Sequence, residues 1–554
     1  MNAAPAEPVS HRDEGAAEIS DDANAARRNS MLSGFGLVSG LTLVSRVLGL
    51  VRDAAMAAAF GNGPLLDAFT IAFRIPNLAR RLFGEGALAA VFIPRFVSTR
   101  ESHGTEDAWK LGTAVLLKTG LFLGGVVVAF EFLLVGAILS GWLGPKSELL
   151  LTLTAVLLPY LWLICLSAQV AAILQASDRF FWPAALPVVL NVVWVAALAI
   201  VGAVALSKEA AITTIAAVIS VTGVLQLGLL IRPLHRIGFR LDFDSTPVRS
   251  ALAAIRTSLV PTLLGLSITQ LNTLADGLIA WGLTPSIDDP NATSLVAAGG
   301  AAALYFGQRL YQFPLGVFAV AIGTVLYPQI SKHATDRNFA AMRSDLTRGM
   351  RLVLLVTLPA SVGLIVLAEP ITALLFERGE FGQRDVLQTS RVVAAYAIAV
   401  WAYALLLIAQ RGFYATGNER APLRVGLVAV FLNLILNAGL VIPLGETGLA
   451  LATAVTAIMQ FLLLASIPGT PLRGVFDRSF VAFIARIAVA TVVMAVACRI
   501  VVVTAGFQSG GNAEGFVAVA IPMLTAIVAY AGVLGVIARR DVLALLTSTR
   551  RPRG

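Results

Sequence analysis

Long apolar runs dominate the sequence and recur from residue 32 almost to the end of its 554 residues. One helical span of a bilayer needs about 20 apolar residues, and fourteen runs reach that length. Charged residues make up only 13% of the chain, about half the share found in soluble domains. The sequence therefore predicts an all-α polytopic membrane protein with about 14 transmembrane helices. The approximate limits of the spans are 32–57, 65–94, 111–140, 149–175, 183–206, 210–231, 257–283, 295–328, 352–376, 388–414, 421–443, 447–469, 480–504 and 515–538.

Twelve of the 41 lysines and arginines lie within the spans, and the others are distributed unevenly over the tails and the connections. The turns after odd-numbered spans hold four of them, whereas the tails and the other connections hold 25. Because basic residues are retained in the cytoplasm, this asymmetry predicts that both termini are cytoplasmic. The excess charge then faces anionic membrane lipids. A nucleic-acid partner is not expected, since no base-reading or stacking residues cluster beside the charge.

The two halves of the chain share weak features at a nearly constant offset, as Phe73-Arg-Ile-Pro76 and Tyr311-Gln-Phe-Pro314 do. Paired repeats with broken helices are typical of transporters, whose substrate site lies between the halves. We expect the long second and eighth spans to be kinked or broken at Pro76 and Pro314. The predicted organisation is a disordered cytoplasmic tail over 1–30, a lobe of spans 1–6 over 31–233, a lobe of spans 7–12 over 250–470, two extra spans over 478–540 and a cytoplasmic tail over 541–554.

Arginines inside the spans are the first candidate functional group. A charge at the bilayer centre costs about 3 kcal/mol on insertion scales, so such residues need a reason to be there. Arg46, Arg52 and Arg309 are the hardest to place at a membrane surface, and Arg80 and Arg81 follow the Pro76 break. Arginine forks match phosphate oxygens, which favours an anionic phosphate or pyrophosphate ligand. The alternative is structural ion pairing with Asp53, Asp67 and Glu85.

A second polar group within the spans is nearly neutral and consists of Asp276, Asn433, Asn437 and Thr453. Asn433 and Asn437 are four residues apart and share one helix face. One carboxylate with amide and hydroxyl oxygens suits a monovalent cation, because hard cations take oxygen ligands. Hydrogen bonding between helices explains the same residues, and both interpretations stay open.

Other chemistries find little support in the sequence. Cys165 and Cys498 both lie in apolar runs, and the four histidines all fall in polar segments. This pattern predicts neither a disulfide framework nor a thiolate or histidine metal centre. A phosphate-binding loop of the Walker type is absent from the sequence, so we expect no nucleotide cofactor. A drug exporter, an exporter of another polyprenyl-linked glycan and a membrane enzyme acting on lipid-linked sugars remain alternatives.

One long block of residues carries a family resemblance. The segments Ser45-Arg-Val-Leu-Gly-Leu-Val-Arg-Asp53, Leu66-Asp-Ala-Phe69 and Phe73-Arg-Ile-Pro-Asn-Leu-Ala-Arg-Arg-Leu-Phe-Gly-Glu-Gly86 lead to Phe92-Ile-Pro94. Together with Arg309-Leu-Tyr-Gln-Phe-Pro-Leu-Gly-Val-Phe318 and Gly412-Phe-Tyr-Ala-Thr-Gly-Asn418, they resemble the lipid II flippase family (MurJ, also called MviN). The resemblance runs from about residue 31 to residue 540.

The resemblance implies a fold, a task and a set of residues. The fold would be that of the multidrug/oligosaccharidyl-lipid/polysaccharide exporter superfamily, and the protein would be a transporter, not an enzyme. The substrate would be lipid II, an undecaprenyl-pyrophosphate-linked peptidoglycan precursor, moved by alternating access across a bacterial inner membrane for cell-wall synthesis. Proteins of cell-wall synthesis would be the partners, and the two extra spans would form a groove for the lipid tail.

By matching motif positions, the resemblance assigns the pyrophosphate to Arg52, Arg80 and Arg309, adds Arg46 as a further substrate-binding residue, and implies supporting polar roles for Asp53, Asp67, Arg81 and Glu85. The resemblance also implies a sodium site at Asp276, Asn433, Asn437, Leu449 (through its backbone carbonyl) and Thr453. Two departures from the family pattern concern charge. Asn437 stands where an acidic ligand can occur, which puts sodium coupling in question, and Gln308 replaces an acid before Arg309.

Overall fold

The computed structural model describes residues 12–84, 87–290, 292–504 and 513–547, and this part of the chain is helical without strands. The first half holds α1 (Arg12–Phe60), α2 (Pro64–Ala79), the π-helix η1 (Arg80–Gly84), α3 (Ala87–His103), α4 (Thr105–Leu139), α5 (Pro145–Ala176), α6 (Phe181–Val204) and α7 (Lys208–Arg236). The second half holds α8 (Arg249–Leu283), α9 (Gly300–Pro314), the π-helix η2 (Leu315–Ala319), α10 (Val320–Thr335), α11 (Phe339–Val366), α12 (Ala368–Phe376), α13 (Gln383–Ala397), α14 (Val400–Ala415) and α15 (Arg420–Ser466). The chain ends with α16 (Arg478–Thr504), α17 (Ala513–Ile537) and α18 (Arg539–Thr547).

Each predicted span has a helical counterpart. By length and hydropathy, ten helical segments of the described chain could cross a membrane, or eleven if the bent pair α13–α14 is one span. The remaining predicted spans are α1, α8 and the second half of α15. α15 is two helices joined at Gly445, whose φ of 58° and ψ of −135° are not helical. Glycine adopts positive φ without a steric penalty, so the turn predicted between spans 11 and 12 falls there.

The two long spans are interrupted at corresponding positions. α2 continues through Pro76 to Ala79 before η1 begins, whereas α9 ends at Pro314 and η2 follows directly. In each half the order is therefore a short helix, a π-helix and a second helix. The predicted breaks are confirmed, although the first lies a few residues beyond its proline.

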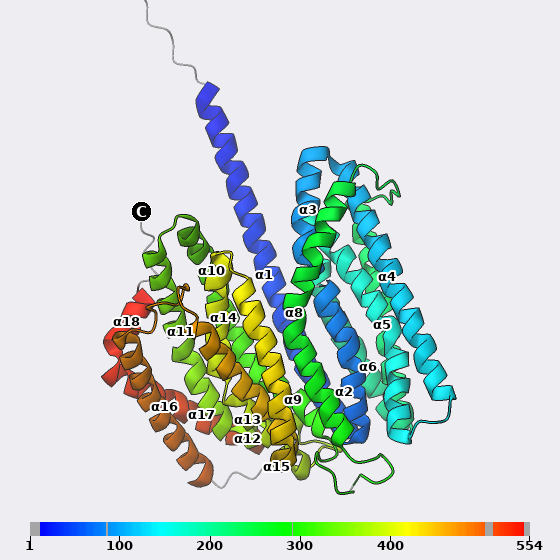
Figure 1. The fold of residues 1–554 in the computed structure, drawn as a ribbon, viewed down its shortest axis with the longest axis vertical. Helices are drawn as coiled ribbons and strands as arrows, with labels where there is room; N and C mark the ends of the chain where they lie inside the picture. The colour runs from blue at the N-terminus through cyan, green and yellow to red at the C-terminus, as the bar shows by residue number, and fades with distance from the viewer. Residues whose placement is uncertain (1–11, 85–86, 291, 505–512, 548–554) are drawn as a thin grey trace, which may run out of the picture.

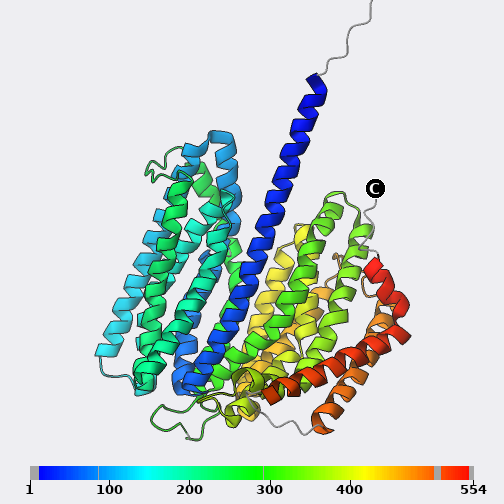
Figure 2. The same ribbon diagram turned by 180° about the vertical axis from the view of Figure 1, so that it is seen from behind.

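The helices form two bundles that stand side by side (Figure 1). In the N-terminal lobe α5 contacts α2, α4 and α7, and in the C-terminal lobe α14 contacts α11 and α15. α16 and α17 pack against each other and against α11 and α12, at the outer side of the C-terminal lobe. α1 packs along α6 and stands between the bundles, as Figure 2 shows from behind. Whether α16 and α17 form a lipid-tail groove stays a prediction.

α8 packs against both lobes, which differs from its predicted membership of the C-terminal lobe alone. Leu252 and Ile255 in its first half pack in one cluster with Phe96 and Trp109 of the N-terminal lobe. The helix also contacts α9 and α15 of the C-terminal lobe. Its 35 residues allow this, because a helix of that length extends about 50 Å. α8 is therefore a strap between the lobes.

The first helix also starts earlier than predicted. Residues 12–30 were expected to be disordered because they are polar, yet α1 begins at Arg12 and is continuous to Phe60. The segment 12–30 lacks proline and is rich in alanine, which favours continuation of a helix already nucleated by the following span. Residues 12–30 therefore continue α1 in the structure, residues 1–11 lie outside the described part, and the predicted disorder of the tail stays a prediction.

The lobes are joined at one end of the molecule. We name it the basic-poor end, because it holds the connections 61–63, 140–144, 205–207, 284–299 and 377–382, which contain few lysines and arginines. The opposite, basic-rich end holds the connections 177–180, 237–248, 336–338, 416–419 and 467–477.

Polar contacts between the lobes gather at the basic-poor end, and we name them the seam. The backbone N–H of Glu380 donates to the carbonyl of Ala58 at 2.9 Å. The Asn62 amide donates to Gln388 at 2.7 Å, and Lys146 Nζ donates to the carbonyl of Thr284 at 2.6 Å. These hydrogen bonds tie residues of the first half to residues of the second half. The structure therefore has the two lobes closed against each other at the basic-poor end.

Candidate functional site

Arg52, Asp53 and Arg309 come together between α1 and α9, and we name them with Tyr305 the arginine cluster. Arg52 donates from Nε and Nη2 to Asp53 Oδ1 at 3.0 and 2.6 Å. Arg309 Nε lies 3.1 Å from Asp53 Oδ2. The Tyr305 hydroxyl donates to Asp53 Oδ1 at 3.1 Å and accepts from Arg309 Nη2 at 3.0 Å. Two guanidiniums thus share one carboxylate, which leaves the cluster with a surplus positive charge.

The two arginines of the cluster differ in exposure. Arg52 is 4% exposed, and its Nη1 donates to Asn191 Oδ1 at 3.0 Å. Its guanidinium also lies 4.4 Å from the ring centroid of Trp194, a cation–π arrangement that fixes its position. The Arg309 side chain is 37% exposed. Arg309 is therefore the cluster member best able to reach a ligand, while Arg52 contributes mainly charge.

Local packing explains why Arg52 is held in place. Trp194 of α6 stacks edge-on against Phe69 and Phe73 of α2, with ring centroids 5.6 and 4.9 Å apart. The Asn191 amide, one turn earlier on α6, donates to the backbone carbonyl of Ser45 at 2.9 Å. α6 therefore holds α1 through Asn191 and packs on α2 through Trp194, so both neighbours of Arg52 on α6 are fixed in place.

The other predicted arginines do not join this cluster. Arg80 donates from Nη2 to Asn77 Oδ1 at 2.9 Å, one turn earlier on the same helix. Arg81 Nη1 donates to Gln270 Oε1 of α8 at 3.0 Å. Arg46 is exposed, and its guanidinium lies against Gly316 of η2, where an added Cβ would be 2.5 Å from Nη1. Arg46 of α1 therefore contacts η2 of the opposite lobe, outside the arginine cluster.

One predicted acidic partner, Asp67, contacts backbone N–H groups and no arginine in the described part of the chain. Glu85 lies outside the described residues. Asp67 is fully buried, and its carboxylate accepts from the backbone N–H groups of Gly299 and Ala302 at 2.9 and 2.7 Å. These groups begin α9, where unpaired N–H groups and the helix dipole attract negative charge. The alternative of structural ion pairing therefore does not hold for Asp67 in the described contacts, because its carboxylate caps a helix of the opposite lobe across the seam.

The neutral residues form a buried hydrogen-bonded group, named here the Asp276 cluster. Asp276 Oδ1 accepts from Asn437 Nδ2 at 2.7 Å, and Oδ2 accepts from Thr453 Oγ1 at 2.7 Å. The side-chain amide of Asn433 lies 2.9 Å from that of Asn437, and Thr453 donates to the carbonyl of Leu449 at 3.2 Å. The carboxamide oxygen Oδ1 of Asn437 is buried without a hydrogen-bond partner. All five predicted residues therefore meet, and the cluster retains a free oxygen ligand.

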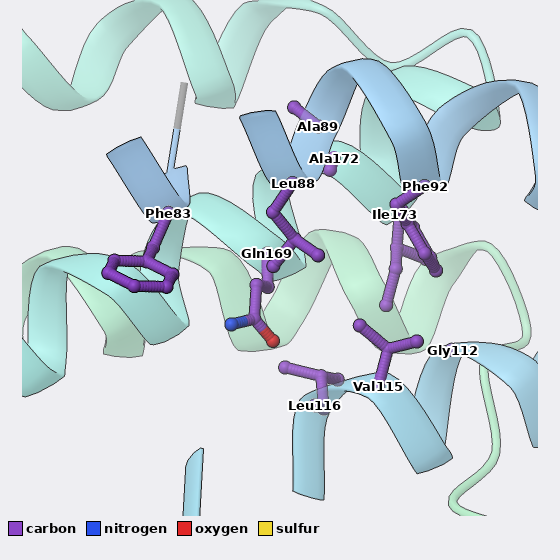
Figure 3. Close-up of a pocket in the computed structure, with 10 residues that line it drawn as sticks. All are labelled: Phe83, Leu88, Ala89, Phe92, Gly112, Val115, Leu116, Gln169, Ala172 and Ile173. Carbon is purple, nitrogen blue, oxygen red and sulfur yellow. The ribbon is translucent and has the colours of Figure 1, made fainter. Parts of the chain in front are cut away.

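Two hollows in the structure lie away from both clusters. Figure 3 shows a cavity of about 10 Å³ between the η1–α3 break, α4 and α5, lined by apolar side chains and Gln169. That volume holds about one water. A groove of about 360 Å³ follows Gly120, Gly124 and Trp162 on α4 and α5. Neither hollow contains the residues that the sequence predicted for a ligand.

Two residues near the clusters were not selected as site residues from the sequence. Tyr305 bridges Asp53 and Arg309, and its position one turn before Arg309 on the predicted eighth span was the available signal. Arg74 lies in the predicted second span and was not among the candidate residues. It is 8% exposed.

The fold and the site define a class of protein. Two helical lobes with corresponding broken helices, joined at one end and carrying unbalanced charge where they meet, are typical of membrane transporters. Solved structures of the same architecture include "Inward-facing conformation of a multidrug resistance MATE family transporter of the MOP superfamily", with a TM-score of 0.59 at 14% identity, covering 77% of this chain and 95% of that chain.

The comparisons then identify the family. The sequence model described as "Lipid II flippase MurJ" matches residues 56–518. A Vibrio cholerae protein named "Probable lipid II flippase MurJ" is 34% identical over 83% of this chain and 86% of its own length. The "Lipid II flippase MurJ" of Burkholderia cenocepacia is 30% identical over 80% and 84%. The solved structure "Lipid II flippase MurJ, inward closed conformation" has a TM-score of 0.72 at 25% identity and covers 91% of this chain and 99% of that chain. The chain belongs to the MurJ lipid II flippase family.

Proposed function

We propose that this protein is a lipid II flippase, which moves a polyprenyl-pyrophosphate-linked peptidoglycan precursor between membrane leaflets by alternating access. Membership of the MurJ family supports the substrate class. The observation that carries the site is the arginine cluster, in which Arg52 and Arg309 share the single carboxylate of Asp53. A pyrophosphate would balance the surplus positive charge, and the partly exposed Arg309 would meet it first.

The basic loops support the proposed direction of transport, from the cytoplasmic to the outer leaflet, and the closed seam is compatible with it. The positive-inside rule places the basic-rich end in the cytoplasm, together with both termini. The protein then lies in a bacterial inner membrane with its lobes joined at the outer side. A headgroup would enter from the cytoplasmic side, be neutralised by the arginines, and leave once the seam opens and the other end closes. A charge that crosses the membrane field is worth about 2.3 kcal/mol per 100 mV, enough to bias such a cycle.

The Asp276 cluster is our proposed coupling-ion site. One carboxylate, two amide oxygens, a hydroxyl and a backbone carbonyl form a donor set that suits Na⁺, and the unpartnered Asn437 Oδ1 favours an ion over hydrogen bonding alone. Asp276, Asn433, Asn437, Leu449 and Thr453 would hold the ion. When bound, Na⁺ would compensate the only carboxylate of the cluster.

Leaflet accessibility of labelled lipid II tests the flippase proposal. We would deplete the native flippase from bacterial cells and supply this protein, an Arg52→Ala, Arg309→Ala double variant, or an Arg351→Gln control. Arg351 donates to Ser479 within the C-terminal half of the chain and takes no part in the seam or the arginine cluster in the described contacts. Restored outward exposure by the wild type and control, but not by the double variant at equal membrane abundance, supports the proposal. Restoration by the double variant would show that the arginines are structural.

The result for the wild-type protein tests the identity of the substrate, whereas the result for the double variant tests the binding site. If correctly inserted wild-type protein restores no exposure, its substrate is another polyprenyl-linked glycan. The sodium proposal needs its own measurement, the rate of exposure in sodium against choline medium for the wild type and Asp276→Asn. Equal rates for the wild type in both media would reject sodium coupling.

A further inference from the structure

Arg74 on α2 is a buried charge without a carboxylate among its hydrogen-bond partners in the described part of the chain. It is 8% exposed. Its Nη1 donates to the backbone carbonyl of Thr273 at 2.5 Å, while Nη2 is buried with no hydrogen-bond partner. A buried guanidinium with a free donor is costly, so its position calls for an explanation.

The guanidinium is seated on α8, the strap between the lobes. A Cβ added at Gly277 would lie 3.0 Å from Arg74 Nη1, so glycine at this position lets the arginine lie flat against the helix. Thr273, the acceptor, is one turn before Gly277 on the same helix face. Asp276 is the immediate neighbour of Gly277. Arg74 therefore contacts the same turn of α8 that contributes the carboxylate of the Asp276 cluster.

Arg74 also lies within electrostatic range of both clusters. The groups that act on its charge are Tyr396, then Asp276 of the Asp276 cluster and Tyr305 and Arg309 of the arginine cluster. The two clusters belong to different helices, α8 with α15 and α1 with α9. A charge on α2 is thus placed where it interacts with the proposed cation site and with the proposed anion site.

We propose that Arg74 is a positioning residue that couples cation binding at the Asp276 cluster to anion binding at the arginine cluster. This inference rests on the proposed function. Without a cation, Asp276 compensates the charge of Arg74. A cation neutralises Asp276, so the guanidinium and its free Nη2 become available to a phosphate beside Arg309. Because linkage is reciprocal, a bound phosphate compensates Arg74 and favours the cation by the same factor.

Binding measurements on the full-length protein in lipid nanodiscs test this coupling. The dissociation constant of lipid II is measured in sodium chloride and in choline chloride at equal ionic strength. We expect the wild type to bind about fivefold or more tightly in sodium, within the usual range of coupling factors. Arg74→Gln is expected to bind lipid II with a sodium-to-choline ratio near one. Arg74→Lys keeps the charge and retains part of the effect.

Two further variants keep the test decisive. Gly277→Ala displaces the guanidinium without changing any charge, so it is expected to reduce the ratio even if Arg74→Gln does not fold. Arg351→Gln is the matched control, because Arg351 lies at the basic-rich end and donates to Ser479; its ratio should equal that of the wild type.

Each remaining outcome has a clear meaning. A wild-type ratio of one, or an unchanged ratio in both Arg74→Gln and Gly277→Ala, overturns the coupling role while leaving lipid II binding intact. Failure of the folded wild type to bind lipid II in either salt rejects the proposed function itself, and the coupling role with it.

Discussion

Replacing Asp67 with asparagine removes one buried charge from the seam without changing the size of the side chain. In the structure its carboxylate accepts two backbone N–H groups of the opposite lobe, from Gly299 at 2.9 Å and Ala302 at 2.7 Å. Asparagine can keep one of these as a neutral hydrogen bond, and its amide N–H₂ would face the other donor. Hydrogen bonds to charged groups contribute about 1.5–3 kcal/mol each, and the helix dipole adds about 0.3–1 kcal/mol.

We therefore expect Asp67→Asn to destabilise the state closed at the seam by about 2–3 kcal/mol. That free energy corresponds to a roughly 30- to 150-fold shift toward the state open at the basic-poor end. Spin labels at Ser140 and Arg384, one on each lobe at that end, would report the shift as a longer distance in a pulsed measurement. Both positions are exposed.

The control for this prediction is Asp288→Asn, which removes an exposed acid from the same end and should leave the distances unchanged. An Asp67→Asn distribution identical to that of the wild type, in protein that binds and folds normally, would refute the reasoning. It would mean that the lobes are held together by apolar packing and that the helix cap contributes little.

Three further predictions concern the seam and the ends of the molecule. Gly299→Ala should also open the seam and slow transport, because the residue has a φ of +84° and an added Cβ would overlap the backbone facing it; Gly282→Ala, where the space is open, should have no effect in the same label assay. Lys208→Gln should change the thermal unfolding temperature little, since an exposed ion pair contributes only about 0.2–1 kcal/mol. Asp477 precedes α16 and accepts a hydrogen bond from the backbone N–H of Phe480 at 2.7 Å, which lowers the pKa of its carboxyl below the ordinary 3.8. The stability that this cap adds is therefore fully present above pH 3.8 and is lost as the pH falls through the lowered pKa. Acid unfolding curves of the wild type and Asp477→Ala should therefore converge at low pH, and parallel curves would contradict the assignment.

Much of the candidate site follows from the sequence because it depends on which spans lie between the lobes. Arg52, Asp53 and Arg309 meet as the family motif implies, and the Asp276 cluster assembles in full. The roles assigned to these residues remain predictions. Arg80 donates to Asn77 of the preceding turn, and its predicted role in phosphate binding also stays a prediction.

The sequence by itself determined the class of the molecule. Apolar runs of span length can satisfy their backbone groups in lipid only as helices, and the breaks near Pro76 and Pro314 follow from a missing N–H and a steric clash. These are local properties, so they can be read from the chain without knowing what surrounds it.

Only the tertiary structure decided which partners the buried charges take. Structural ion pairing with an arginine was the alternative for Asp67, but its hydrogen-bond partners are the N–H groups that begin α9. Arg74 lies in the predicted second span, and only the structure shows that its guanidinium is buried against α8. Electrostatic and hydrogen-bond energies depend on distances between residues hundreds of positions apart. Those distances are set by how the two lobes pack, and the sequence does not contain them in any local pattern.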